Sequence, residues 1–150
     1  MLRYDSRASS RQVQRLVTNS QNVSYIADVT VLEFASSAAT ICRKRRWTVD
    51  KFDAMSRLFF KDLAAVKLLV RETTKRDVLR ATHLMRWVGA HNGRNLRSAD
   101  ALIATCCLYL SYEINRRVTF YTSDNKLYKV LCDTNAFNSA LDLKFLDPIQ

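Results

Sequence analysis

Residues 118–127, VTFYTSDNKL, decide the fold class that we predict for this chain. The β-branched and aromatic run Val118–Thr122 is typical of a strand, and the segment from Asn125 onward has the apolar spacing of a helix. Asp124 lies at the junction, where a carboxylate can cap the helix. A strand that leads directly into a helix favours an α/β architecture, and the rest of the chain repeats this alternation.

The same alternation extends outward from this segment in both directions. We predict further strands at residues 23–27, 66–70 and 143–147. We predict helices at residues 9–17, 28–45, 49–65, 74–88, 98–112 and 125–132. Asp28 and Ser98 are the expected N-caps of two of them, and Thr74 with Asp77 is similar to a capping box. The segment 89–95, which carries both glycines, is predicted to be a loop. This order predicts a single domain over residues 1–150, a three-layer α/β/α sandwich with a central parallel sheet.

The composition limits the classes of partner. The chain has 150 residues and a formal net charge of +10, which fits RNA, DNA or an acidic protein as partner; a basic, solvated surface is the alternative. Its four cysteines show no zinc-type spacing and read as reduced thiols. No apolar stretch is long enough for a membrane span, and the first residues contain no apolar signal segment, so we expect a cytoplasmic protein without membrane contact.

Three acidic residues, Glu33, Asp100 and Asp124, each lie in or next to the first turns of a predicted helix, where we expect a strand to give way to a helix. The carboxyl ends of parallel strands meet at one edge of a sheet, so these side chains can converge although they are far apart in sequence. Gathered carboxylates repel one another unless a cation lies between them, which points to divalent-metal and phosphodiester chemistry. Asp100 in a first helical turn and Asp124 as an N-cap also have structural explanations. Glu33, beside an apolar helix stripe, has the weakest one.

The segments that carry these acids are VTVLEFASS (29–37), LRSADALIATC (96–106) and VTFYTSDNKLYKVL (118–131). They resemble three successive motifs of the PIN-domain ribonucleases, most closely the VapC-type toxins of toxin–antitoxin pairs. Glu33, Asp100 and Asp124 match the acidic residues of the family's second, third and fourth motifs, and the closing FLDP is similar to its C-terminal strand end. The resemblance covers residues 23–148.

The resemblance implies a Mg²⁺-dependent endoribonuclease, with Mn²⁺ as the alternative ion. In this interpretation Asp100 and a first-motif Asp hold the main ion, Asp124 supports it, and Glu33 holds a metal-bound water or a second ion. It also implies an RNA substrate, a cognate antitoxin and a homodimer.

Other polar residues near the predicted site are candidates for substrate contact. Arg97 lies one helical turn before Asp100, and Arg94 lies in the predicted loop, so both can contact an RNA phosphate. The hydroxyl groups of Thr122 and Ser123 can hold a metal-bound water or a phosphate oxygen. The basic run 43–46 is a candidate for backbone contact, or else a cationic helix end that complements the helix dipole.

The chain departs from the family pattern at its N-terminus, where two alignments remain open. In one, residues 1–5 form the first strand, and Asp5 with Ser6 is the first motif. In the other, the first strand with its Asp is missing from this sequence, because Arg3 suits a central strand poorly.

Three functions follow from these observations. The first is an endoribonuclease toxin. The second is a catalytically impaired PIN-like module that binds RNA or an antitoxin without cleavage. The third is a DNA-directed nuclease, which fits the charge but fits the motif spacing less well.

Overall fold

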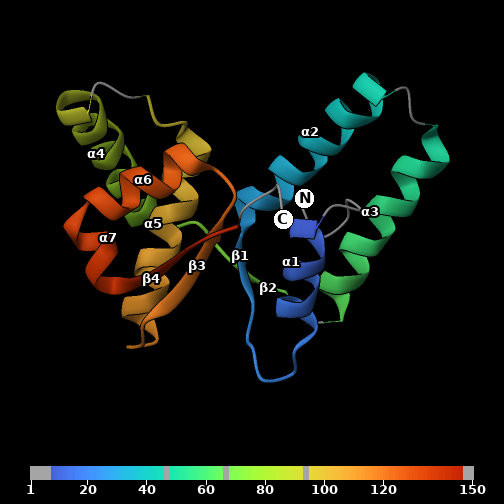
Figure 1. Ribbon diagram of the computed structural model, residues 1–150, viewed down its shortest axis with the longest axis horizontal. Helices are drawn as coiled ribbons and strands as arrows, with labels where there is room; N and C mark the ends of the chain where they lie inside the picture. Colours follow the sequence, from blue (N-terminus) through green and yellow to red (C-terminus); the bar gives the residue numbers. More distant parts are fainter. Residues whose placement is uncertain (1–7, 46–47, 66–67, 93–94, 147–150) are drawn as a thin grey trace. The chain divides into compact units, whose positions relative to one another are not determined.

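The structure, a computed structural model, describes residues 8–45, 48–65, 68–92 and 95–146 (Figure 1). The chain divides into two compact units. The first unit comprises residues 1–70 with 148–150, and the second comprises residues 71–147. Each unit has its own hydrophobic core.

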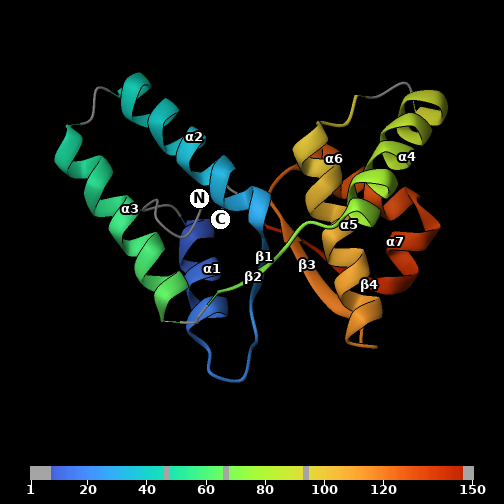
Figure 2. The same ribbon diagram turned by 180° about the vertical axis from the view of Figure 1, so that it is seen from behind.

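The first unit consists mainly of helices. It contains α1 (Ala8–Thr18), β1 (Tyr25–Ala27), α2 (Asp28–Arg45) and α3 (Val49–Ala64). Strand β2 (Leu69–Arg71), whose last residue belongs to the second unit, pairs with β1. Helix α2 starts directly after β1, where the Asp28 carboxylate accepts a hydrogen bond of 2.7 Å from the Val29 N–H. Helices α2 and α3 lie side by side (Figure 2), and their contact buries Phe34 against Phe59, whose rings stack with centroids 4.0 Å apart.

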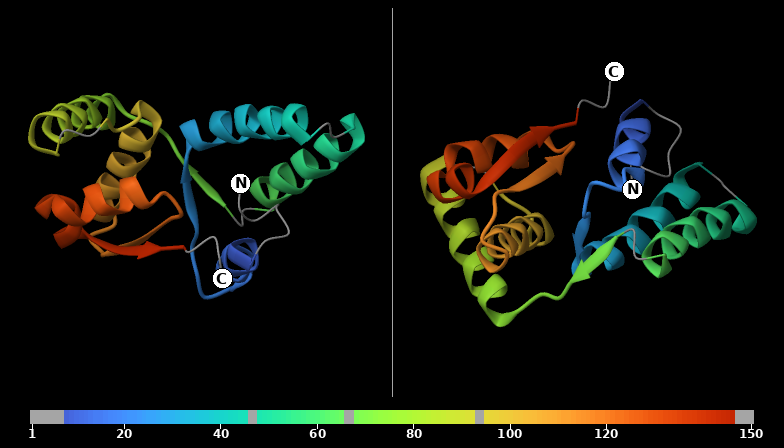
Figure 3. Two further views of the ribbon diagram at one scale, coloured as in Figure 1. Left: turned by 45° about the horizontal axis from the view of Figure 1, so that its top comes forward. Right: turned by 90° about the horizontal axis from the view of Figure 1, so that it is seen from below.

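The second unit begins with two long helices and ends with a parallel strand pair. Its elements are α4 (Lys75–Asn92), α5 (Ser98–Glu113), β3 (Val118–Thr122), α6 (Asn125–Asp133), α7 (Asn135–Ala140) and β4 (Leu141–Phe145). Strands β3 and β4 are parallel and in register from Val118 opposite Leu141 to Thr122 opposite Phe145 (Figure 3). Helix α5 and the α6–α7 pair pack against these strands.

Helix α5 is the centre of the second unit. It is apolar on nearly all sides, as expected for a helix that is surrounded by other elements. Ala104, Leu108 and Leu110 are buried, and the small Ala101 allows close packing at its first turn. The core continues through fully buried residues of α6 and β4, including Leu131 and Leu141.

The prediction of a mixed α/β protein is confirmed, but the predicted three-layer arrangement around a central sheet is not shown. The structure is 69% helical, and its strands are short. In the described part of the chain, the strands form two separate pairs, β1 with β2 and β3 with β4, instead of one central sheet. The three-layer sandwich and the single domain therefore stay predictions.

Several element boundaries match the sequence analysis and several do not. The helix at 28–45 and the strand at 118–122 are confirmed. The last strand starts two residues earlier than predicted, and α7 was not predicted. The strand predicted at 66–70 is observed at Leu69–Arg71, and residues 66–67 lie outside the described part.

Two predictions about the region around Gly89 and Ser98 are wrong. Helix α4 continues to Asn92, so the first half of the predicted loop is helical. Gly89 lies inside this helix and has no heavy atom within 4 Å of the position where a Cβ would be, so no close approach requires it. Arg97, and not Ser98, occupies the N-cap position of α5, and it makes no side-chain cap.

Candidate functional site

Asp100 lies in the first turn of α5 and is only half-buried. The turn is fixed by the Ala101 N–H, which donates 3.0 Å to the carbonyl oxygen of Arg97. The free N–H groups of a first turn favour a nearby negative charge. The carboxylate of Asp100 is therefore held at the edge of the second unit, at the helix end where anions are stabilised.

Asp124 directly follows β3 and caps α6. Its Oδ1 accepts hydrogen bonds from the N–H groups of Lys126, at 2.8 Å, and Leu127, at 3.1 Å. The structural explanation that the sequence offered for this residue is thus confirmed. Both cap bonds use the same oxygen, so the Oδ2 atom of this carboxylate lies outside the cap.

Asp100 and Asp124 interact electrostatically. Partial burial raises the pKa of Asp100, and repulsion from the Asp124 carboxylate raises it further, whereas the positive charge of Arg97 lowers it. Residues from two parts of the sequence, Arg97 with Asp100 and Asp124, are therefore close enough to interact electrostatically. The catalytic and metal-binding roles of these residues stay predictions.

The hydroxyl residues next to Asp124 are also placed at this edge. Thr122 and Ser123 are half-buried. The Thr122 Oγ1 accepts a hydrogen bond of 3.1 Å from the Asp124 N–H, and the Thr122 carbonyl oxygen accepts one of 2.8 Å from the Leu146 N–H. The Thr122 hydroxyl thus has a role in fixing the backbone of the β3–α6 junction, and its predicted contact with substrate stays a prediction.

Three predicted site residues remain, Glu33, Asp5 and Arg94. Glu33 lies in α2 of the first unit and is half-buried. Its predicted meeting with Asp100 and Asp124 stays a prediction. Asp5 and Arg94 lie outside the described residues.

The residues of the pair fit a hard divalent cation. Two carboxylates that repel each other are stabilised by a cation, and Mg²⁺ is usually bound through one or two carboxylates while it keeps several waters. Across residues 8–45, 48–65, 68–92 and 95–146, no group of three or more His, Cys, Asp or Glu side chains that could hold a metal ion is found. Asp100 and Asp124 are thus two residues of the second unit that could hold such an ion.

A second charged cluster was missed by the sequence analysis. Arg71 donates hydrogen bonds of 3.0 Å to Asp77 and 2.7 Å to Glu113. Burial by itself would raise the pKa of Asp77, but hydrogen bonds from Thr74 and Arg71 and the charge of Arg71 hold this pKa below its usual value. Sequence reasoning predicted the Thr74–Asp77 capping box, which is confirmed, but Arg71 and Glu113 are 42 positions apart and carry no local signal of contact.

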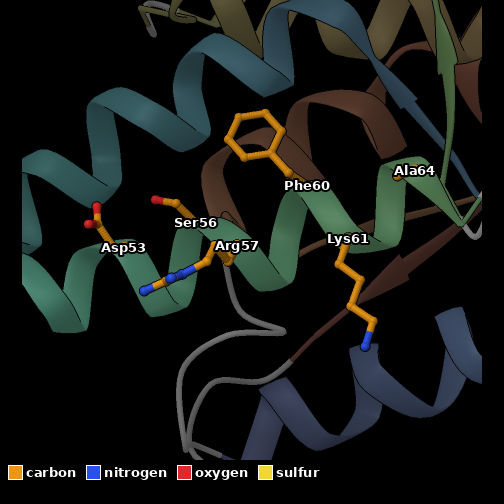
Figure 4. A pocket seen from close by; sticks show the side chains of 6 residues that line it. All are labelled: Asp53, Ser56, Arg57, Phe60, Lys61 and Ala64. Carbon is orange, nitrogen blue, oxygen red and sulfur yellow. The ribbon is translucent and has the colours of Figure 1, made fainter.

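A shallow hollow lies along α3 in the first unit (Figure 4). Its lining residues come from this one helix: Asp53, Ser56, Arg57, Phe60, Lys61 and Ala64. Acidic, basic and aromatic side chains alternate there without a convergent set of polar groups. The hollow therefore does not define a chemical site.

Comparison with known proteins provides no relative for this chain. No protein-family model, curated protein or solved structure matches it. Within the described ranges, none of the helices has both the length and the apolar character that crossing a membrane requires.

Proposed function

We propose that this protein is a divalent-metal-dependent endoribonuclease, with Asp100 and Asp124 at its metal site. The observation that carries the proposal is the placement of these two carboxylates near each other, one in the first turn of α5 and one at the start of α6. A net charge of +10 supports a polyanionic substrate, because an acidic pair on a basic protein can hold a cation while the surrounding surface attracts phosphate.

The residues of this edge have distinct roles in the proposed reaction. Asp100 and Asp124 would hold a divalent ion. When bound, this ion would activate a water and neutralise charge on the phosphodiester. Asp124 is oriented by its N-cap bonds, and Arg97 contacts a substrate phosphate as a positive charge.

The finer parts of the proposal come from the PIN-like motifs. They are the toxin role in a type II toxin–antitoxin pair, a cognate antitoxin, a homodimer, a cytoplasmic location and a central parallel sheet. They also include Glu33 and Asp5 as further ligands and Mg²⁺, or alternatively Mn²⁺, as the ion.

The test is RNA cleavage by the purified protein with and without Mg²⁺. We expect cleavage that stops on addition of EDTA and that falls on the order of 100-fold or more in Asp100→Asn, comparable to the loss of one preorganised electrostatic group. Asp100→Asn also removes the repulsion from Asp124 that raises the pKa of Asp100, so this variant should be no less stable than the wild type. Metal-independent cleavage, or full activity in a folded Asp100→Asn protein, would contradict the proposal.

A module that binds RNA or an antitoxin without cleavage is the second candidate. The N-cap role of Asp124 favours it, because this role accounts for the carboxylate without any metal. RNA binding without cleavage at any divalent-ion concentration, in protein that is fully folded, would favour this candidate over the enzyme.

A further inference from the structure

The outer face of α4 is strongly basic. The exposed side chains of this helix include Lys75, Arg76, Arg80 and Arg86, together with the apolar Val78 and Leu79. The one acidic residue of α4, Asp77, is fully buried and paired with Arg71. An exposed helix face usually mixes charges of both signs, as α3 does with Asp50, Lys51, Asp53 and Arg57. No exposed acidic side chain of α4 offsets the positive charges on its face.

Two aromatic side chains of α5, the half-buried Tyr109 and the exposed Tyr112, adjoin this face. The guanidinium of Arg76 lies over the Tyr109 ring, 5.3 Å from its centroid. Tyr112 packs edge-on against Tyr109, with centroids 6.0 Å apart, and is 55% exposed. The acidic neighbour of this cluster on α5, Glu113, is engaged by Arg71. The cation–π contact orders Arg76 in advance, which lowers the entropy cost of using it in binding.

The helix hairpin connects this cluster with the acidic pair. Arg76, at the start of α4, meets Tyr109, near the end of α5, so the two packed helices run antiparallel (Figure 2). The C-terminal part of α4, which includes Arg86, therefore lies beside the end of α5 that carries Asp100. The ten residues from Arg76 to Arg86 span about 15 Å of helix, which is long enough for several phosphates.

We propose that the basic face of α4, with Tyr112 of α5, binds single-stranded nucleic acid. Arg76, Arg80 and Arg86 contact backbone phosphates, and an unpaired base stacks on the exposed Tyr112 ring. A single strand fits better than a duplex because it presents free base faces next to its phosphates. This inference adds a substrate-binding surface to the proposed function. It rests on the proposed function only for the claim that the bound strand then reaches Asp100.

The experiment measures binding by fluorescence anisotropy, in EDTA, of a labelled oligouridylate of about 12 nucleotides. Arg76→Gln/Arg80→Gln removes two positive charges from α4, and Arg57→Gln/Lys61→Gln removes two from α3 as the matched control. We expect the slope of log affinity against log salt to fall by about 1.4 in the α4 variant, which corresponds to two lost phosphate contacts with a single strand. The α3 variant should stay near the wild-type slope.

Tyr112→Leu tests the stacking contribution and keeps the charge unchanged. We expect about a fivefold to 150-fold loss of affinity, the range for one base stacked on an aromatic ring. The same oligonucleotide in DNA form distinguishes the two chemical sources: equal binding assigns the face to single strands in general, and preference for RNA assigns it to RNA. A tighter complex with a duplex of the same length, or with an acidic polypeptide such as polyglutamate, would overturn the proposal.

Equal losses in the α4 and α3 variants would also overturn it, because they would indicate attraction by net charge alone. The nuclease assignment and the α4 surface can fail independently of each other. If oligouridylate binds through α4 but no RNA is cleaved with Mg²⁺, the nuclease assignment is wrong and the α4 surface stands. If RNA is cleaved and Arg76→Gln/Arg80→Gln cleaves and binds as the wild type does, the α4 surface is wrong and the nuclease stands.

Discussion

At the scale of single residues, Asp124 carries two roles that substitution can separate. Asn caps a helix about as well as Asp but has no charge, whereas Ala removes the cap as well. We expect Asp124→Asn to keep the wild-type stability and lose most RNA cleavage, and Asp124→Ala to lose in addition about 0.5–2 kcal/mol of unfolding free energy. Urea denaturation and a cleavage assay in Mg²⁺ measure the two effects. Wild-type activity in Asp124→Asn would assign this residue to capping alone.

The same residue shows how far sequence reasoning reaches. A carboxylate between a strand and a helix predicts an N-cap from local spacing, and the hydrogen bonds to Lys126 and Leu127 confirm it. Local spacing does not determine which distant residues approach it. The electrostatic contact of Asp124 with Asp100 depends on the packing of α5 against β3, and it followed only from the expectation that strand ends converge.

At the scale of elements, a buried charge pair joins the end of β2 to the start of α4. The side chain of Asp77 is fully buried and that of Arg71 is 9% exposed, whereas that of Glu113 is 51% exposed. Removing one partner of a buried pair leaves an uncompensated charge, so we expect Arg71→Met to lose about 3–5 kcal/mol of unfolding free energy. Glu113→Gln is the control, since an exposed pair contributes about 0–1 kcal/mol. Equal losses in both variants would contradict this assignment.

The pH dependence of this pair has a definite sign. Asp77 has a pKa below its usual value in the folded protein, so its contribution to stability is present above the unfolded pKa and is lost as the pH falls through the folded pKa. In Arg71→Met, burial raises the pKa of Asp77 without opposition from a guanidinium. The stability difference between wild type and variant should therefore shrink when urea denaturation is repeated at pH values below the ordinary aspartate pKa of 3.8.

Elements were predicted more reliably than their arrangement. Helix 28–45 and strand 118–122 have strong local signals, an apolar period with a capping Asp28 and a β-branched run, and both have the predicted bounds. The segment from Gly89 continued as a helix because the apolar packing of Val88 and the preceding turn outweighs the low helix propensity of one glycine. Strand pairing is decided by distant contacts, and the predicted central sheet is seen only as two pairs in the described residues.

At the scale of the whole molecule, the two units differ in how much apolar surface they bury. Among the described residues, the core cluster of the first unit consists of four buried side chains, Phe34, Ala38, Phe59 and Leu68. That of the second unit consists of thirteen, centred on α5. Regions with fewer buried apolar contacts open at lower free energy, so local stability should differ along the chain.

Hydrogen exchange followed by mass spectrometry tests this difference. We expect amides of α2 and α3 to exchange with opening free energies at least about 2 kcal/mol below those of α4 and α5, a difference that corresponds to one or two buried aliphatic side chains. The exchange is measured in the presence of EDTA and without nucleic acid, because a ligand bound at Asp100 or on α4 would stabilise the second unit by mass action. Equal protection of α2 and α5 would mean that the chain opens as one cooperative body, in agreement with the single domain predicted from its sequence.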